Sequence, residues 1–175
     1  MFIKIHIIKF EVTVQTNIQY RKIMISTSQC PLPEIVNSHN KKTTMVFAIF
    51  NHQTAILESK FEGKITVNDL VECSLNIKEN KSYPRFLKIL IDSKKAIANF
   101  SSNELALLAE EHFKIVEKYD YVVTAIILET PKETAFAMLF QNLIKNNKSK
   151  FQLFATREAA IKWLNNYTES NCHRV

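Results

Sequence analysis

A run of apolar residues followed by a well-capped helix constrains the fold of this chain more than any other feature. Residues 86–91, with the sequence FLKILI, are nearly all apolar, which is typical of a strand covered on both faces in a parallel sheet. The run ends at Asp92. A helix is predicted to follow, because Ser101 and Glu104 have the spacing of a capping box and apolar residues then recur at helical intervals up to Tyr119. This unit predicts an α/β fold with a parallel sheet.

Strands and helices alternate on both sides of this unit. The predicted elements are, in order, a hairpin of strands 46–50 and 54–62, a helix opened by Thr66 and Asp69, the strand from Phe86 to Asp92, the helix from Ser101, a strand at 121–128, a helix at 131–143 opened by a full capping box at 130–133, a strand at 151–154 and a helix capped by Thr156. Gly63 is predicted to take a positive φ in the turn after the hairpin. The expected fold class is therefore α/β, with an N-terminal β-hairpin and a four- to five-stranded, mostly parallel sheet with about four helices.

The composition changes near residue 45, which predicts a domain boundary there. Residues 1–44 are predicted to be an N-terminal extension, with a possible strand at 2–15, where apolar and polar residues alternate, and then a linker. Because Met45 is a possible alternative start, this extension could also be an over-called start. The α/β domain is predicted to span 45–168, and a polar tail is predicted at 169–175.

Glycine content and charge exclude several classes of function. Gly63 is the only glycine in the chain, against a usual content of about 7%. A Walker A loop, a dinucleotide fingerprint and a nucleophile elbow each need two or more glycines, so none exists here in standard form. The net charge of +6 is uneven, since residues 1–44 contribute +4 and the rest of the chain carries 17 basic against 15 acidic residues. Because nucleic-acid binders usually concentrate basic residues on one face, nucleic-acid binding is not expected.

Cysteine and histidine patterns give no metal or redox site. The three cysteines, at positions 30, 73 and 172, form no CxxC pair, so free thiols in a reducing cytoplasm are expected. His112 follows Glu111 but lacks the second histidine of a zinc helix, and it is interpreted as a core residue rather than as part of a triad with Asp92 and a serine. No apolar run reaches the roughly 20 residues of a membrane span. The protein is expected to be cytoplasmic and non-enzymatic, without metal or cofactor.

The ends of the predicted strands indicate a candidate binding edge. In a parallel sheet the loops after the strands gather at one edge, and the helix N-termini there favour anions. The candidate edge residues are Asp92, Ser93, Lys94, Ser101, Ser102 and Thr130. The alternative interpretation is structural: the serines cap a helix, and Asp92 caps a loop or pairs with a neighbouring lysine.

Four aromatic residues of the last two predicted helices allow a second kind of site. Phe136, Phe140, Trp163 and Tyr167 recur at helical spacing. They are interpreted as core residues, or as the lining of a cavity for an apolar ligand.

Four segments of the chain carry a resemblance to a known family. They are FEGKIT at 61–66, LKILID at 87–92, FSSNEL at 100–105 and FATREAAIKWL at 154–164. In layout, the chain from about residue 45 to 164 resembles the SpoIIAA-like branch of the STAS superfamily, which is related in fold to CRAL-TRIO lipid carriers. The resemblance implies a sheet of four or five strands with helices, and a non-enzymatic role.

In anti-sigma-factor antagonists of this superfamily, a serine in an Asp-Ser-Ser-Gly-Leu-like motif at the start of a helix is phosphorylated. The resemblance therefore points to Ser101 or Ser102 as a phosphorylation site. Phe100 stands where that motif has its aspartate, and the glycine of the motif is missing.

The expected function is that of a binding or regulatory module. It would engage a protein partner or a small anionic ligand at the candidate edge. The alternative is a carrier of a small apolar or lipid-like ligand, held in a cavity between helices and sheet. A homodimer is also left open.

Overall fold

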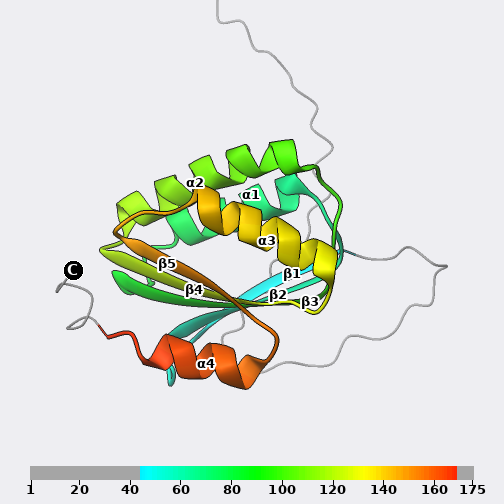
Figure 1. Cartoon of the computed structure of the whole chain (residues 1–175). Helices are drawn as coiled ribbons and strands as arrows, with labels where there is room; N and C mark the ends of the chain where they lie inside the picture. Colours follow the sequence, from blue (N-terminus) through cyan, green and yellow to red (C-terminus); the bar gives the residue numbers. More distant parts are fainter. Residues whose placement is uncertain (1–43, 169–175) are drawn as a thin grey trace, which may run out of the picture. The chain divides into compact units, whose positions relative to one another are not determined.

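The computed structural model describes residues 44–168, in which helices cover both faces of one sheet (Figure 1). The elements are β1 (Met45–Asn51), β2 (Ile56–Ile65), α1 (Val67–Glu79), β3 (Phe86–Ala98), a 3-10 turn η1 (Ser102–Glu104), α2 (Leu105–Lys118), β4 (Tyr121–Ile127), α3 (Pro131–Leu143), β5 (Ser149–Phe154) and α4 (Arg157–Asn165). The strand predicted at 2–15 and the tail predicted at 169–175 lie outside the described residues.

The five strands lie side by side in chain order, β1-β2-β3-β4-β5. β1 is antiparallel to β2, and every other neighbouring pair is parallel. The connections from β2 to β5 run through α1, α2 and α3, which cover one face of the sheet, whereas α4 covers the other (Figure 1). The predicted fold class is confirmed: an opening hairpin, a mostly parallel five-stranded sheet and four α-helices.

The sheet buries apolar side chains on both faces, as parallel strands between helices require. The core facing α1 and α2 includes Leu57, Leu87, Ile89, Ile115, Val116, Tyr119 and Val122. The core facing α4 includes Ile56, Leu90, Val123, Ala125, Ile127, Ala160 and Leu164. Each fully buried aliphatic side chain contributes about 1.5–3 kcal/mol, so these two clusters hold the layers together.

Two helix starts are as predicted. At α1, the Asp69 carboxylate accepts the Thr66 amide at 2.9 Å, and the Thr66 hydroxyl accepts the Asp69 amide at 3.3 Å. At α4, the Thr156 hydroxyl accepts the Ala159 amide at 3.3 Å. These bonds join residues three apart in the chain, and the sequence therefore shows both partners.

β3 continues past its predicted end at Asp92 as far as Ala98. A bulge interrupts it, because between the pairs Lys60–Asp92 and Glu62–Lys95 β3 has two residues, Ser93 and Lys94, where β2 has only one. The Asp92 carboxylate accepts the Lys94 amide at 3.2 Å within this bulge. The prediction that the strand ends at Asp92 is wrong, because the bulge breaks the alternation and its two lysines have the composition of a loop.

Gly63 has the predicted positive φ, 81°, but its predicted place in a turn is wrong. It lies inside β2, opposite Ala96 of the extended part of β3. The hairpin turn is at residues 52–55, where the Asn51 side chain accepts two backbone amides and Ala55 has a φ of 54°. The longer β3 extends the pairing of β2 past the glycine.

The capping box predicted at the start of α3 is incomplete. Thr130 is the N-cap and Pro131 the first helical residue, as predicted, and the Thr130 hydroxyl donates to the Glu133 carboxylate. The other Glu133 oxygen accepts the amide of Ala98, at 3.2 Å, instead of the Thr130 amide. The Lys132 ammonium donates to the Ala98 carbonyl at 3.1 Å. The first turn of α3 therefore binds the end of β3 rather than closing its own box.

Candidate functional site

The structure separates the residues that were predicted at the strand ends. Asp92 and Ser93 are neighbours on β3 and so face opposite sides of the sheet. Asp92 lies on the α4 side, in a cleft with Arg157. Ser93 is buried on the side covered by α1, α2 and α3. Lys94, on the bulge, is exposed. These residues do not form one site.

The other three predicted edge residues lie at helix starts, and all three are exposed. The Ser101 amide and hydroxyl both donate to the Glu104 carboxylate, at 2.7 and 2.9 Å, and these bonds hold the pKa of Glu104 below its usual value. At Thr130 only the hydroxyl donates to the Glu133 carboxylate. Carboxylates thus already occupy the electropositive ends of two helices, where an anionic ligand was expected. No described residue forms a hydrogen bond with the Ser102 side chain.

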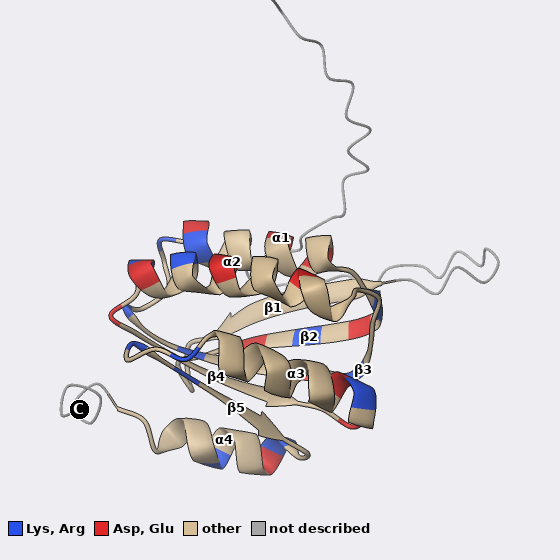
Figure 2. Cartoon of the chain, turned by 45° about the horizontal axis from the view of Figure 1, so that its top comes forward, with Lys and Arg blue, Asp and Glu red and all other residues tan. Residues whose placement is uncertain are grey.

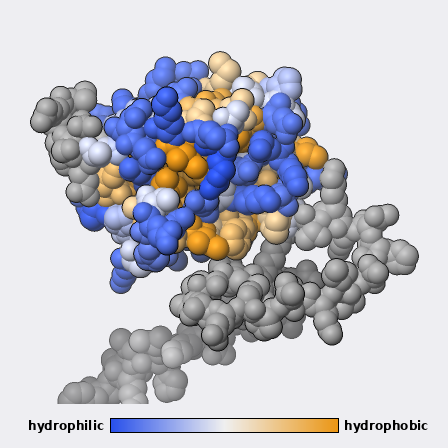
Figure 3. Space-filling view, turned by 90° about the horizontal axis from the view of Figure 1, so that it is seen from below, coloured by the Kyte–Doolittle hydropathy of each residue, from blue (hydrophilic) through white to orange (hydrophobic). Residues whose placement is uncertain are grey.

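The α4 side of the domain carries a mixed surface (Figure 3). Its ion pair joins Arg157 of α4 to Glu58 of β2 at 2.5 Å. Met45, Phe47 and Ile49 of β1 are exposed. Figure 3 shows apolar patches between hydrophilic ones on this side. The cleft here has a volume of about 320 Å³ and a more polar lining, and its charged groups are partly paired with each other.

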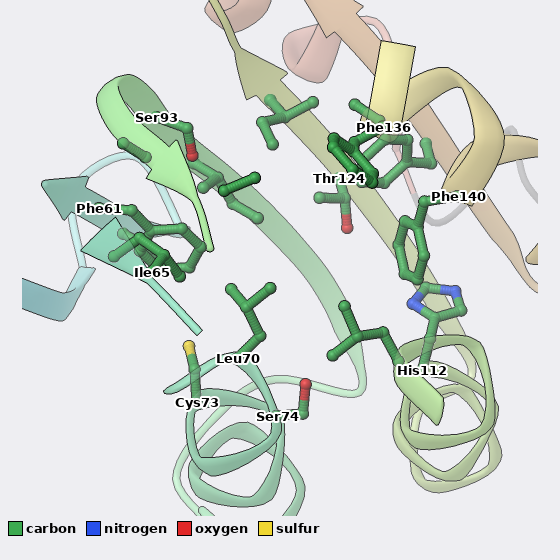
Figure 4. Close-up of a pocket in the computed structure, with 18 of the residues that line it drawn as sticks. Phe61, Ile65, Leu70, Cys73, Ser74, Ser93, His112, Thr124, Phe136 and Phe140 are labelled. Carbon is green, nitrogen blue, oxygen red and sulfur yellow. The ribbon is translucent and has the colours of Figure 1, made fainter. Parts of the chain in front are cut away.

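A cavity of about 190 Å³ lies on the opposite side, between the sheet and the helices α1, α2 and α3 (Figure 4). Its sheet side comes from β2, β3 and β4, with Phe151 of β5, and its helix side from all three helices. Most of the lining is apolar, for example Phe61, Ile65, Leu70, Ile91 and Leu108. The cavity therefore offers a mostly apolar, half-open volume on the helix-covered side of the sheet.

Aromatic rings form one wall of the cavity. Phe136 and Phe140 of α3 line it, as one interpretation of the sequence expected. Phe100 packs on Phe136 with ring centres 5.4 Å apart, and Phe151 packs on Phe140 at 5.5 Å. Trp163 and Tyr167 are not part of this wall, because α4 lies on the other face of the sheet, where they pack near Phe154. The core interpretation therefore fits Trp163 and Tyr167, and the cavity interpretation fits only Phe136 and Phe140.

A few polar groups interrupt the apolar lining. Ser59, Ser93 and Thr124 lie on the sheet side, and Cys73, Ser74 and His112 on the helix side (Figure 4). Burial raises the pKa of the Cys73 thiol to about 11 and lowers the pKa of His112 to about 4. Both groups are therefore uncharged near neutral pH. The His112 Nε2 atom lies 3.2 Å from the Ser149 hydroxyl.

The sequence did not show that these polar groups line one cavity. Among them, His112 was predicted only to be a core residue. A small polar residue on the buried face of an otherwise apolar strand could have indicated the cavity. Thr124 in YVVTAII and Ser59 in ILESKF are such residues. Such a residue has no partner within its own strand, so it needs one from another element or from a ligand.

Residues 44–168 contain neither a group of metal-binding side chains nor a membrane-spanning helix. No three histidine, cysteine, aspartate or glutamate side chains in that range are placed so that they could hold a metal ion. No helix in the same range has both the length and the apolar character needed to cross a membrane.

The comparisons with known proteins give a likeness to a solved structure. No protein-family model matches the chain, and no curated protein matches its sequence. Among solved structures, it is similar to an uncharacterized protein of the DUF3478 family with a SpoIIAA-like fold, from Shewanella loihica PV-4. The two share 16% identity over 74% of this chain and 99% of the other, with a TM-score of 0.49. That fold is the one the sequence resemblance named, and at this similarity the match bears on neither ligand nor partner.

Proposed function

We propose that this domain binds a small apolar molecule in the cavity between β2–β4 and α1–α3. The observation that supports the proposal is the cavity itself, about 190 Å³ with a mostly apolar lining. Protein interiors are close-packed, and a void of this size leaves its lining atoms without contacts that a ligand would restore. This is the carrier alternative expected from the sequence, and the geometry supports it better than the strand-end edge.

The polar groups of the cavity suit binding better than reaction. The Cys73 thiol is held in its protonated form, which is not nucleophilic. The His112 imidazole is neutral and already contacts Ser149 through Nε2. We therefore assign the cavity a binding role.

The test is a thermal unfolding and calorimetry experiment with ethylbenzene as the probe. Binding to the folded state should raise Tm as the probe concentration rises. At a probe concentration of 100 times Kd, the free energy of unfolding should increase by about 2.7 kcal/mol. Ala137→Leu, at a buried lining position on α3, should fill part of the cavity and abolish the shift. Ala135→Leu, on the exposed side of the same helix, is the matched control and should bind normally. Equal binding by both variants would place the probe elsewhere and contradict the proposal.

A second candidate function is self-association through the outer face of α3. Met138, Leu139 and Leu143 are 54%, 50% and 48% exposed. α3 carries charged residues only in its first turn, and Figure 2 shows the rest of this helix in tan, the colour of uncharged residues. Exposed apolar residues grouped on one helix mark interaction surfaces, and an uncharged face does not repel a second copy of itself.

Sedimentation of the full-length protein tests this candidate. A dimer is expected for the natural sequence, and Leu139→Glu should convert it to a monomer. Phe47→Glu is the control, because Phe47 is an exposed apolar residue on β1, away from α3, and lies opposite Lys60, whose positive charge suits a neighbouring carboxylate. A monomeric natural protein would rule out this interface.

The candidate edge stays a hypothesis for a partner or for phosphorylation. The exposed hydroxyl of Ser102, which no described residue binds, is the more accessible of the two serines. Intact-mass analysis of protein from its own host would detect a phosphate, and a fully unmodified protein would count against the switch.

A further inference from the structure

One hydroxyl in the cavity has no hydrogen-bond partner. Ser59 lies in the middle of β2 and is only 4% exposed, and its Oγ atom forms no hydrogen bond with any described residue. Its side chain is on the cavity face of the sheet, since its neighbours on that face, Leu57 and Phe61, pack toward α1. A buried hydroxyl without a partner destabilises a fold, and a ligand is one way to supply the missing bond.

Ser59 is one of three buried hydroxyls on the sheet side of the cavity. It lies opposite Ile91 in the register of β2 and β3, and Ser93 follows Ile91 two residues later on the same face. Thr124 of β4 lies opposite Ile89. The three hydroxyls thus lie beside Ile89 and Ile91 on the sheet side of the cavity, which makes this side the place for the polar end of a ligand.

The charge of the cavity limits what that polar end can be. Among the described residues, Glu133 is the only charged one in the lining, and both of its oxygens already accept hydrogen bonds, from Ala98 and Thr130. None of the described lysines or arginines lines the cavity. A carboxylate or phosphate bound here would lose its hydration without gaining a counter-charge, which is strongly unfavourable. A neutral polar group needs only a hydrogen bond.

The volume limits the size of the ligand. An apolar protein cavity of about 150 Å³ holds a benzene molecule. The cavity here, at about 190 Å³, is slightly larger and suits one substituted aromatic ring or a chain of similar volume. The aromatic wall formed by Phe136 and Phe140 fits a ring, because rings pack edge to face against one another.

We infer that the cavity selects a small neutral molecule, of about the size of a substituted benzene, whose single hydrogen-bonding group binds the Ser59 hydroxyl. This inference rests on the proposed function and adds to it the charge, the size and the anchoring residue. It excludes ionised fatty acids and phosphorylated molecules as ligands of this cavity.

Three probes of matched shape test the inference by calorimetry at pH 7.5 on the full-length protein. They are ethylbenzene, 4-ethylphenol and ionised 4-ethylbenzoate. The phenol should bind at least tenfold more tightly than ethylbenzene, and the benzoate at least tenfold more weakly than the phenol. In Ser59→Ala the advantage of the phenol over ethylbenzene should disappear, while ethylbenzene should bind as before. Ser82→Ala, in the exposed loop before β3, is the control and should keep the advantage.

The outcomes separate the inference from the proposed function. If ethylbenzene binds but the phenol gains nothing, or keeps its gain in Ser59→Ala, the inference is overturned and apolar binding stands. Binding of the benzoate as tight as that of the phenol overturns it too. If no probe binds, the proposed function fails with it.

Stability without ligand gives an independent readout. Ser59→Ala should unfold at the same urea concentration as the natural protein or at a higher one, because it removes an unsatisfied group. A clear decrease would show that Ser59 has a partner within the chain, and would overturn its role as the anchor.

Discussion

His112 is held neutral by its place in the fold. It lies between the cavity and Ser149, and burial lowers its pKa to about 4, whereas an unfolded chain has a histidine pKa near 6.5. Between these values the unfolded chain binds more protons than the folded one, so the free energy of unfolding should fall as pH decreases from 6.5 to 4, by up to about 3 kcal/mol. Urea unfolding at a series of pH values measures this.

The matched variant for this prediction is His112→Gln, which keeps a hydrogen-bonding side chain but does not titrate. Most of the pH dependence between 6.5 and 4 should be absent from it. Carboxylates such as Glu104, whose pKa is also lowered, titrate at the acid end of the range in both proteins and cancel in the comparison. Equal slopes for the two proteins would contradict the assignment.

Ser101 and Ser102 provide a matched pair for the start of α2. Ser101→Ala should lower the free energy of unfolding by about 1 kcal/mol, because it removes the hydroxyl that bonds Glu104 in the capping box. Ser102→Ala should change stability by less than about 0.5 kcal/mol, since no described residue bonds its side chain. Thermal and urea unfolding measure both. A larger effect at Ser102 would reverse the assignment of the cap.

For single residues, the sequence predicts contacts between positions that are close in the chain. The caps at Thr66 and Thr156 bond residues three positions away, so their partners are visible in the sequence. The partner of Glu133 is Ala98, which is 35 residues away, and no local pattern indicates it. The same holds for Ser59, because its surroundings come from three other elements.

The β3 bulge is the element that most changes the candidate site. Up to Ser93 the odd-numbered residues of β3 line the cavity, and after the bulge Ala96 and Ala98 do so. Without the extra residue, the alternation would turn these alanines toward the other face. The bulge therefore allows one strand to line the whole length of the cavity.

Asp92 stabilises this bulge through the bond to the Lys94 amide. Asp92→Ala should lower the free energy of unfolding by about 1 kcal/mol, the usual value of one hydrogen bond. Asp92→Asn keeps an oxygen acceptor, and its stability should stay close to that of the natural protein. Urea unfolding of the three proteins measures the difference. Equal losses in both variants would show that the charge of Asp92, rather than the bond, is what matters.

Element order was predictable because apolar runs and helix caps are strong local signals. The position of α4 was not, since its apolar stripe at Ala160 and Leu164 packs equally well against either face of a sheet that is apolar on both. Trp163 with Tyr167 and Phe136 with Phe140 are both aromatic pairs four residues apart. The two pairs nevertheless lie on opposite sides of the sheet. The aromatic wall of the cavity could therefore be found only from the structure.

At the scale of the whole molecule, the predicted boundary near residue 45 remains to be tested. Residues 44–168, the part that the structure describes, contain the two core clusters named above and a cavity with a mostly apolar lining. A protein made of these residues alone should unfold in one cooperative transition, and it should bind ethylbenzene with the Kd of the full chain. Urea unfolding and calorimetry provide the comparison. A non-cooperative transition would mean that the domain extends beyond these limits.

The parallel sheet followed from the alternation of strands and helices, whereas the cavity depends on how the helices are spaced above the sheet. Spacing of that kind is set by side chains from five or more elements at once, here from Phe61 on β2 to Phe140 on α3. A sequence pattern gives the face on which each residue lies. It does not give the volume left between the faces.

The attachment of Ala98 to α3 has a consequence for the rate at which the cavity exchanges its contents. Past the end of β4, this part of β3 has no strand on that side, and Glu133 and Lys132 bond Ala98 instead. A movement of α3 away from the sheet must break these bonds and expose the Ala98 amide to solvent. The deuterium exchange of that single amide would thus report how often the cavity opens, before any ligand is known.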